Sequence, residues 1–232
     1  MLRVSDWAGF AKRELGLTTV FLGFALLALG FLALDRAMGG HFDQSLLIAL
    51  RTPGDLDNPV GPPSFEEAVR DITALGSFAV LTLVTVVAVV FLVVSKKYAE
   101  ATTLLFAAVL GQVLSETIKA FIGRPRPDLV AHVVDTTSAS FPSGHSMMSA
   151  AIFLTIGAML ARVQANWRLK SYIHVVALLL TLMVGASRVY LGVHWPTDVL
   201  AGWCFGALWA ILCLTVVAWL TRSKDDGGPP AS

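Results

Sequence analysis

The chain has 232 residues, of which 56% are hydrophobic and 14% are charged, and its formal net charge is +1. Soluble globular domains carry about 25% charged residues, so this composition excludes an ordinary soluble domain. We therefore expect a membrane protein that contacts membrane lipids and has no nucleic-acid partner.

Long apolar runs predict membrane-spanning helices, which need about 20 predominantly apolar residues. Three charge-free runs cover residues 15–34, 72–95 and 199–221, and three weaker ones cover 101–118, 146–161 and 171–187. The sequence thus predicts an all-α fold, a polytopic membrane protein with six transmembrane helices in one bundle. No internal repeat or second domain is visible, and the oligomeric state is left open.

The two ends of the chain lie outside the predicted membrane domain at residues 15–222. Residues 1–14 combine Trp7 and Phe10 with basic side chains, which predicts an interfacial segment without a cleavable signal. Residues 223–232 have a turn-forming composition and are predicted to be a disordered tail. Cys204 and Cys213 are interpreted as small packing residues rather than as an assigned disulfide.

A long loop at residues 35–71 follows the first predicted span. Its middle, residues 52–63, is rich in proline, glycine and aspartate and predicts turns. Ser64 and the acidic residues after it predict the capped start of a helix. The loop forms either part of a lid or lateral gate, or a simple link between two spans.

The distribution of basic residues predicts the orientation. With six spans, ten of the seventeen lysines and arginines fall on the side that holds both termini. The positive-inside rule places that side in the cytoplasm. The opposite face, towards the periplasm or exterior, then carries three polar clusters at residues 119–127, 141–145 and 187–198.

The first cluster, KAFIGRPRP, supplies Lys119, Arg124 and Arg126. Its two prolines should end the preceding helix and hold the arginines in an extended segment. These cations could bind a phosphate, balance the dipole of the helix end or anchor lipid headgroups. Glu116 is interpreted as a supporting group that pairs with Lys119 or Arg124.

The second cluster, FPSGH, contains Ser143, Gly144 and His145 just before an apolar run. A serine and a glycine at a helix start expose backbone N–H groups and the positive end of the helix dipole to an anion. This predicts a phosphate cradle with His145 at its rim. An ordinary capped helix would have the same pattern.

The third cluster, SRVYLGVHWPTD, contains Arg188, His194 and Asp198. His194 and Asp198 are four residues apart, and Pro196 predicts a helix start between them. A carboxylate on one imidazole nitrogen would leave the other free to act as nucleophile or base. The alternative is a histidine at the membrane interface beside a helix cap.

Taken together, the three clusters resemble the signature of the type 2 phosphatidic acid phosphatase family, part of the superfamily of lipid phosphate phosphatases and vanadium haloperoxidases. The matching elements are Lys119 with six residues before Arg126-Pro127, then Pro142 to His145, then Ser187-Arg188 with five residues before His194 and three more before Asp198. The resemblance covers roughly residues 75 to 220. Arg124 is additional to the signature and is interpreted as extra positive charge.

The resemblance implies specific roles for these residues. His194 would be the nucleophile that forms a phosphohistidine, Asp198 would orient it, and His145 would protonate the leaving group. The phosphate oxygens would bind Lys119, Arg126, Arg188, Ser143 and Gly144. It also implies a metal-independent enzyme without a cofactor, acting at the outer membrane interface of a bacterial cytoplasmic (inner) membrane.

The expected substrate is a phosphomonoester or pyrophosphate on a lipid. Undecaprenyl pyrophosphate is ranked first, followed by phosphatidylglycerol phosphate and phosphatidic acid, with lipid A phosphates behind. A lipid phosphotransferase with the same residues and a noncatalytic lipid-binding protein are the alternatives. A vanadium haloperoxidase is disfavoured because those enzymes are soluble.

Overall fold

The computed structural model describes residues 39–131 and 138–225, together with the single positions 30, 33, 35 and 37. The predicted interfacial segment 1–14, nearly all of the predicted span 15–34 and tail residues 226–232 lie outside the described residues. The described part is mainly helical, with one short two-stranded sheet.

The first loop is more structured than a run of turns. Helix α2 (His41–Ala49) leads into an antiparallel hairpin of β1 (Arg51–Thr52) and β2 (Asp55–Pro59). Helix α3 (Pro63–Ala74) follows, with Pro62 at its N-cap position and no side-chain cap. The predicted Ser64 cap is therefore wrong, because the fixed backbone of Pro63 already starts the helix one residue earlier.

The predicted span at 72–95 is not one continuous helix. Helix α3 ends at Ala74, helix α4 (Phe78–Val94) begins after a short break, and the two are bent by 48°. The Ser77 hydroxyl accepts a hydrogen bond from the Val80 N–H at 3.3 Å. This N-cap starts a new helix inside the apolar run, a local signal that hydropathy does not read.

Four helices in the described residues are long and apolar enough to cross a membrane, or up to five if the bent pair α3–α4 is one span. The four are α5 (Tyr98–Ile122), α6 (Gly144–Arg162), α7 (Trp167–Tyr190) and the Pro196–Ala218 part of α8 (Pro196–Asp225). Six spans are therefore not confirmed. Helix α8 also continues three residues into the predicted tail.

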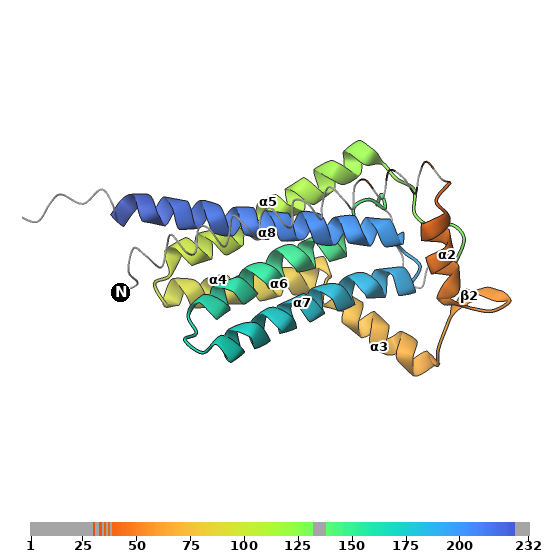
Figure 1. Cartoon of the computed structure of the whole chain (residues 1–232), viewed down its shortest axis with the longest axis horizontal. Helices are drawn as coiled ribbons and strands as arrows, with labels where there is room; N and C mark the ends of the chain where they lie inside the picture. The colour runs from red at the N-terminus through yellow and green to blue at the C-terminus, as the bar shows by residue number, and fades with distance from the viewer. Residues whose placement is uncertain are drawn as a thin grey trace, which may run out of the picture.

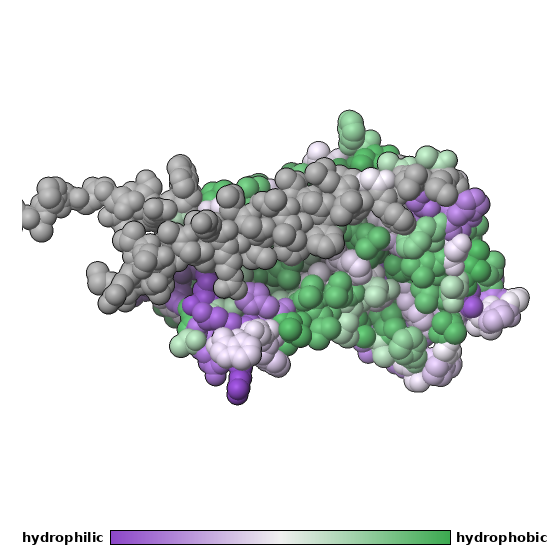
Figure 2. Space-filling view, in the orientation of Figure 1, coloured by the Kyte–Doolittle hydropathy of each residue, from purple (hydrophilic) through white to green (hydrophobic). Residues whose placement is uncertain are grey.

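The distribution of apolar residues on the surface agrees with membrane-spanning helices. Apolar side chains spread over the middle of the face in Figure 2, and hydrophilic ones gather near its two ends. Many large apolar residues of α4 and α5 are exposed, including Phe78, Val87 and Phe106. Such exposure is normal only where lipid replaces water as the solvent.

Helix α6 lies at the centre of the bundle and packs against α5, α7 and α8. Small residues allow the close approach of α8. A Cβ on Gly206 would lie 2.2 Å from the Met147 carbonyl oxygen, and one on Gly202 would lie 2.8 Å from the Ser143 carbonyl oxygen. Small residues four apart are a common device for packing membrane helices.

The connectivity brings the three polar clusters to one end of the bundle. Figure 1 shows the C-terminal ends of α5 and α7 and the N-terminal ends of α6 and α8 at the end that also carries α2 and the hairpin. Each cluster occupies one of these helix ends or the segment beside it. Residues far apart in the sequence thus meet at one site.

Candidate active site

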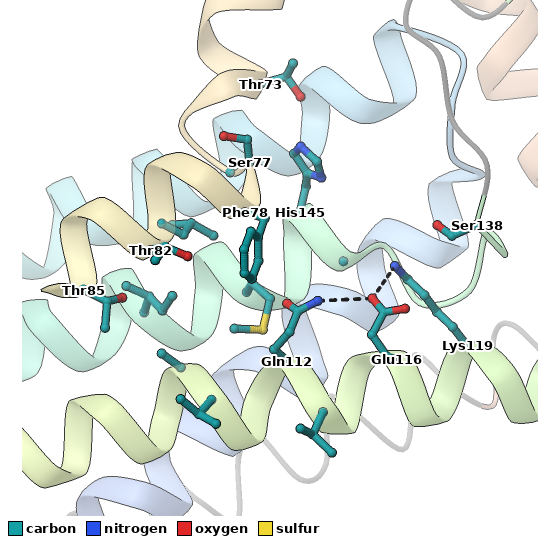
Figure 3. Close-up of a pocket in the computed structure, with 18 of the residues that line it drawn as sticks. Thr73, Ser77, Phe78, Thr82, Thr85, Gln112, Glu116, Lys119, Ser138 and His145 are labelled. Atoms are coloured by element: carbon teal, nitrogen blue, oxygen red, sulfur yellow. Dashed lines mark hydrogen bonds and ion pairs between the residues drawn. The ribbon is translucent and has the colours of Figure 1, made fainter.

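A cavity of about 820 Å³ lies at this end of the bundle. All three clusters contribute to its lining, through Lys119, Arg126, Gly144, His145, Arg188 and His194. Figure 3 shows Lys119 and Ser138 at one end of the lining, Thr82 and Thr85 at the other, and His145 between them. Two predicted site residues, Ser143 and Asp198, are fully buried behind the lining.

His194 sits between a carboxylate and a guanidinium. Its Nδ1 lies 3.7 Å from Asp198 Oδ2, and its Nε2 lies 3.2 Å from Arg126 Nη1. Arginine can only donate, so the Nε2 that faces it must be the unprotonated nitrogen. The proton then lies on Nδ1, towards Asp198, and the Nε2 lone pair faces the cavity.

Burial lowers the pKa of His194 to about 4. The nearby Asp198 carboxylate opposes this effect, and the positive charge of Arg126 adds to it. An ordinary imidazole has a pKa of about 6.5. His194 is therefore neutral at physiological pH, which is the protonation state that a nucleophile requires.

Both oxygens of Asp198 are occupied. Oδ2 accepts hydrogen bonds from the Ser140 hydroxyl and, at 3.1 Å, from the Trp195 N–H. Oδ1 accepts one from Arg124 Nη1 at 2.6 Å. Ser140 Oγ also lies 3.4 Å from His194 Nδ1, so this serine contacts both members of the pair.

Sequence reasoning missed Ser140. It lies immediately before the FPSGH cluster, and a lone serine in that position carries no signal of its own. Its Oγ is placed by the backbone, because the Ser140 N–H donates to the Arg124 carbonyl at 2.8 Å.

Two arginines line the cavity, and hydrogen bonds to neighbouring residues fix the guanidinium group of each. Arg126 donates through Nε to the Ser138 carbonyl at 2.8 Å and through Nη1 to the Val193 carbonyl at 2.6 Å. Arg188 donates through Nη1 to Thr73 Oγ1 at 3.0 Å, and its Nε has no partner among the described residues. Guanidinium groups fixed in this way bind phosphate oxygens with defined geometry.

Lys119 forms the predicted pair with Glu116, at 3.1 Å between Nζ and Oε1. The same Glu116 oxygen accepts a hydrogen bond from Gln112 Nε2 at 3.2 Å, so the three side chains form a row along α5 (Figure 3). Lys119 therefore lies at the cavity beside the Glu116 carboxylate. This carboxylate competes with a bound phosphate for the ammonium group.

The start of α6 has the predicted cap. Ser143 Oγ accepts from the Ser146 N–H at 3.4 Å and from the Ser146 hydroxyl at 2.9 Å. Gly144 follows on the cavity side, where a Cβ would lie 3.0 Å from Lys119 Nζ. The absent side chain lets the ammonium group lie close to the positive end of the helix.

Arg124 does not line the cavity. It is buried and donates to Asp43 Oδ2 at 2.7 Å as well as to Asp198, so two carboxylates neutralise it. From the sequence, Arg124 is interpreted as extra positive charge, but the two carboxylates compensate that charge and it does not reach the cavity. Its guanidinium lies beside Asp198, whereas that of Arg126 lies beside His194 Nε2.

The cavity continues as a groove between α4 and α5. Its walls include the apolar residues Leu81, Val86 and Leu105, with Thr82 and Thr85 among them. Thr85 Oγ1 is buried and has no partner among the described residues. A molecule that fills both parts would need a phosphate at one end and an apolar portion with some polar groups at the other.

Within the described ranges, no group of three or more histidine, cysteine, aspartate or glutamate side chains could hold a metal ion. Both cysteines are free.

Comparisons with known proteins agree with this description. Residues 100–222 match the model of the PAP2 superfamily. The chain is 33% identical over 183 residues to phosphatidylglycerophosphatase B of Bacillus subtilis, covering 78% of this chain and 88% of the relative. It is 32% identical over 143 residues to lipid A 1-phosphatase of Rhizobium johnstonii, covering 55% of this chain and 53% of the relative.

Among solved structures, the chain resembles a transmembrane PAP2-type phosphatidylglycerolphosphate phosphatase from Bacillus subtilis, with a TM-score of 0.73 and 26% identity. The match covers 92% of this chain and 98% of that one.

The fold and cavity define a helical membrane protein with a histidine-containing cationic pocket that continues into a largely apolar groove. The chain belongs to the PAP2 superfamily. It is a PAP2-type lipid phosphatase, a hydrolase of phosphoric esters, and a multi-pass protein of a bacterial inner membrane.

Proposed function

We propose that the enzyme hydrolyses a lipid phosphate through a phosphohistidine on His194. The observation that carries this is the cavity-facing Nε2 of a neutral, buried imidazole, with Arg126 at 3.2 Å. An arriving phosphate takes over the N–H of Arg126, which frees the Nε2 lone pair for in-line attack. The P–O bond to the lipid breaks as the P–N bond forms.

His145 is the proposed general acid. Its ring lines the same cavity, and it protonates the leaving lipid oxygen. In the second step it removes a proton from water, which attacks phosphorus, breaks the P–N bond and releases inorganic phosphate. Asp198 holds the Nδ1 proton of His194 in both steps.

Three fixed cations supply the charge that phosphoryl transfer needs. Lys119, Arg126 and Arg188 lie around the cavity and stabilise the equatorial oxygens, together with the first amides of α6 at Gly144 and His145. Ser143 supports this role indirectly, as the cap of that helix. We expect activity to persist in a chelator such as EDTA, and loss that magnesium restores would contradict the mechanism.

Phosphatidylglycerol phosphate is our first candidate substrate, ahead of the undecaprenyl pyrophosphate favoured by the sequence. The groove below the pocket carries Thr82, Thr85 and Gln112, which match the ester and hydroxyl groups of a glycerolipid better than a pure hydrocarbon chain. The Bacillus subtilis relatives bear names of this activity. The proposal also includes the orientation, with both termini in the cytoplasm and the pocket facing the periplasm or exterior.

Phosphate release from a panel of purified lipid phosphates in detergent tests this function. The panel contains phosphatidylglycerol phosphate, phosphatidic acid, undecaprenyl pyrophosphate and a lipid A phosphate, with His194→Ala as control. Transfer of labelled phosphate to a lipid or sugar acceptor without release of free phosphate would instead identify a phosphotransferase. Binding without turnover would identify a lipid-binding protein.

A further inference from the structure

Arg124 is buried on the side of the third cluster that faces away from the cavity. Its side chain is 7% exposed, and its Cζ lies 5.4 Å from the ring centroid of Trp195. The Trp195 ring is itself fixed by a hydrogen bond from Nε1 to the Pro125 carbonyl at 3.0 Å. A guanidinium this buried is strongly destabilising unless charged partners surround it, so its partners indicate its role.

Those partners are two carboxylates from distant parts of the chain. Nη1 donates to Asp198 Oδ1 at 2.6 Å, and Nη2 donates to Asp43 Oδ2 at 2.7 Å. Asp198 and Asp43 are 0% and 1% exposed. Asp43 belongs to α2, so Arg124 connects the first loop to the carboxylate beside His194.

Thr197 closes the network. Its N–H donates to Asp43 Oδ1 at 2.9 Å, its hydroxyl donates to Asp43 Oδ2 at 2.6 Å, and that hydroxyl accepts from Arg124 Nη1 at 2.8 Å. Thr197 is the second residue of α8. Asp43 therefore lies at the N-terminal end of that helix, where the helix dipole favours a negative charge.

We propose that Arg124 and Asp43 are positioning residues for the His194–Asp198 pair. This inference rests on the proposed function of that pair. Arg124 occupies Oδ1, so Asp198 presents Oδ2 to His194 Nδ1 and cannot rotate. Asp43 holds the opposite side of the guanidinium, and it holds the first turn of α8, which carries Asp198. The first loop thus contributes Asp43 to the buried side of the site and helps to orient the catalytic pair. This role differs from that of a lid and from that of a simple link.

The rival interpretation treats Arg124 as a fourth phosphate-binding cation beside Lys119, Arg126 and Arg188. The two interpretations differ in the kinetic constant that changes. A phosphate ligand contributes to substrate binding, so its loss raises KM and weakens inhibition by inorganic phosphate. A positioning residue acts on the nucleophile, so its loss lowers kcat and the rate of phosphohistidine formation.

The experiment compares Arg124→Gln, Arg124→Lys and Asp43→Asn with the wild-type enzyme in detergent. We expect Arg124→Gln to lower kcat by about 10- to 100-fold, by analogy with the loss of a hydrogen-bond partner behind a metal ligand. KM and the inhibition constant of phosphate should stay within about threefold of the wild-type values. Asp43→Asn should lower kcat as well, because an amide has only one acceptor oxygen. Its NH₂ group would face a donor at the other position, either the Thr197 N–H or the Arg124 guanidinium with the Thr197 hydroxyl. Arg124→Lys keeps one charge-assisted hydrogen bond and should lie between.

A spectroscopic measurement separates positioning from general loss of structure. In ¹⁵N-histidine NMR spectra the wild-type His194 should be the Nδ1–H tautomer, and the Gln and Asn variants should show a mixture with Nε2–H. Matched controls on the exposed face of α3 are Arg70→Gln and Asp71→Asn. They should retain wild-type kinetics and the wild-type His194 tautomer. Thermal unfolding in the same detergent gives the folded fraction to which all rates are referred.

Two outcomes would overturn the inference. The first is a tenfold rise in KM and in the phosphate inhibition constant with kcat unchanged, which would make Arg124 a phosphate ligand. The second is wild-type kcat and a single tautomer in Asp43→Asn, which decides the matter even if Arg124→Gln does not fold. Failure of the proposed function is distinct, because the wild-type enzyme would then hydrolyse lipid phosphates without any trapped phosphohistidine.

Discussion

Arg124 and Arg126 belong to the same RPRP segment and lie two residues apart, yet they serve opposite sides of one histidine. Arg126 faces the cavity and contacts Nε2 of His194. Arg124 faces the buried side and contacts the carboxylate next to Nδ1. A regular strand would direct side chains two residues apart to the same face, but residues 124–127 form neither a strand nor a helix, so the two arginines can point to different sides of His194.

The two sides differ in how their charges are compensated. On the buried side Arg124 has two carboxylate partners and is only 7% exposed. On the cavity side, within the described residues, Arg126 contacts carbonyls, a serine hydroxyl and a neutral imidazole. Uncompensated positive charge is thus concentrated where an anion can enter, which suits the binding of a phosphate.

His194 lies between Arg126 and Asp198, so its removal should have the largest effect on activity. We expect His194→Ala to lose at least about 10⁴-fold in phosphate release, as in other enzymes that lose their nucleophile. His145→Ala should lose much less on a substrate with a good leaving group, since such a group departs without an acid. Single-turnover assays with ³²P-labelled substrate measure both effects. Substantial turnover by His194→Ala would show that another group attacks phosphorus.

Arg126 tests the cavity side alone. Arg126→Gln should lower kcat/KM by about 10²- to 10³-fold, the usual effect of losing one donor to a developing oxyanion, and should also weaken inhibition by phosphate. This pattern contrasts with the kcat effect expected for Arg124→Gln. Steady-state kinetics with both variants, and with Arg70→Gln as control, measure the difference. Identical changes in KM for the two arginines would remove the distinction between the sides.

The pKa of His194 depends on both sides of the site, because Arg126 on the cavity side lowers it and Asp198 on the buried side raises it. Burial and Arg126 lower its pKa and Asp198 raises it, with the net value at about 4. The folded protein therefore binds this proton less readily than the unfolded chain, whose imidazole titrates near 6.5. Stability that the neutral His194 contributes is present above pH 6.5 and is lost as pH falls towards 4.

Titration by ¹⁵N-histidine NMR, with His194→Gln to assign the signal, should place the midpoint at a pH of about 4, well below the value of about 6.5 for a free imidazole. Arg126→Gln should move it upwards. A midpoint at or above 6.5 would mean that Asp198 outweighs burial.

Much of the cavity side was predictable from the sequence, because motif spacing constrains it. Lys119, Arg126, His145, Arg188 and His194 line one cavity, as their positions at helix ends on one side of a bundle require. The helix starts at Gly144 and Pro196 follow local rules for serine caps and N-terminal prolines.

The buried side was not predictable in the same way. Asp43 is one acid among several in the long first loop, and only its contacts with Thr197, 154 residues away in the sequence, show its role. Ser140 and the break between α3 and α4 are similar cases, since each depends on a tertiary contact or a single cap. Hydropathy and motif spacing describe neither.

The smallest expected effect concerns Glu116, the carboxylate that pairs with Lys119 at the edge of the cavity. Its side chain is half exposed, so the pair itself contributes little to stability. A second phosphate on the substrate would bring more negative charge towards this carboxylate than a single phosphate does. Glu116→Gln should therefore favour a lipid pyrophosphate over a lipid monophosphate by a factor of about 3 to 5 in kcat/KM, the value of one exposed charge interaction.

Competition assays with phosphatidylglycerol phosphate and undecaprenyl pyrophosphate measure this ratio directly. Glu67→Gln, an exposed residue of α3, is the matched control and should leave the ratio unchanged. A ratio that moves towards the monophosphate in Glu116→Gln would mean that Glu116 acts by holding Lys119 in place rather than by repelling the second phosphate. In that case the cavity side, like the buried side, depends on a carboxylate to position its cation.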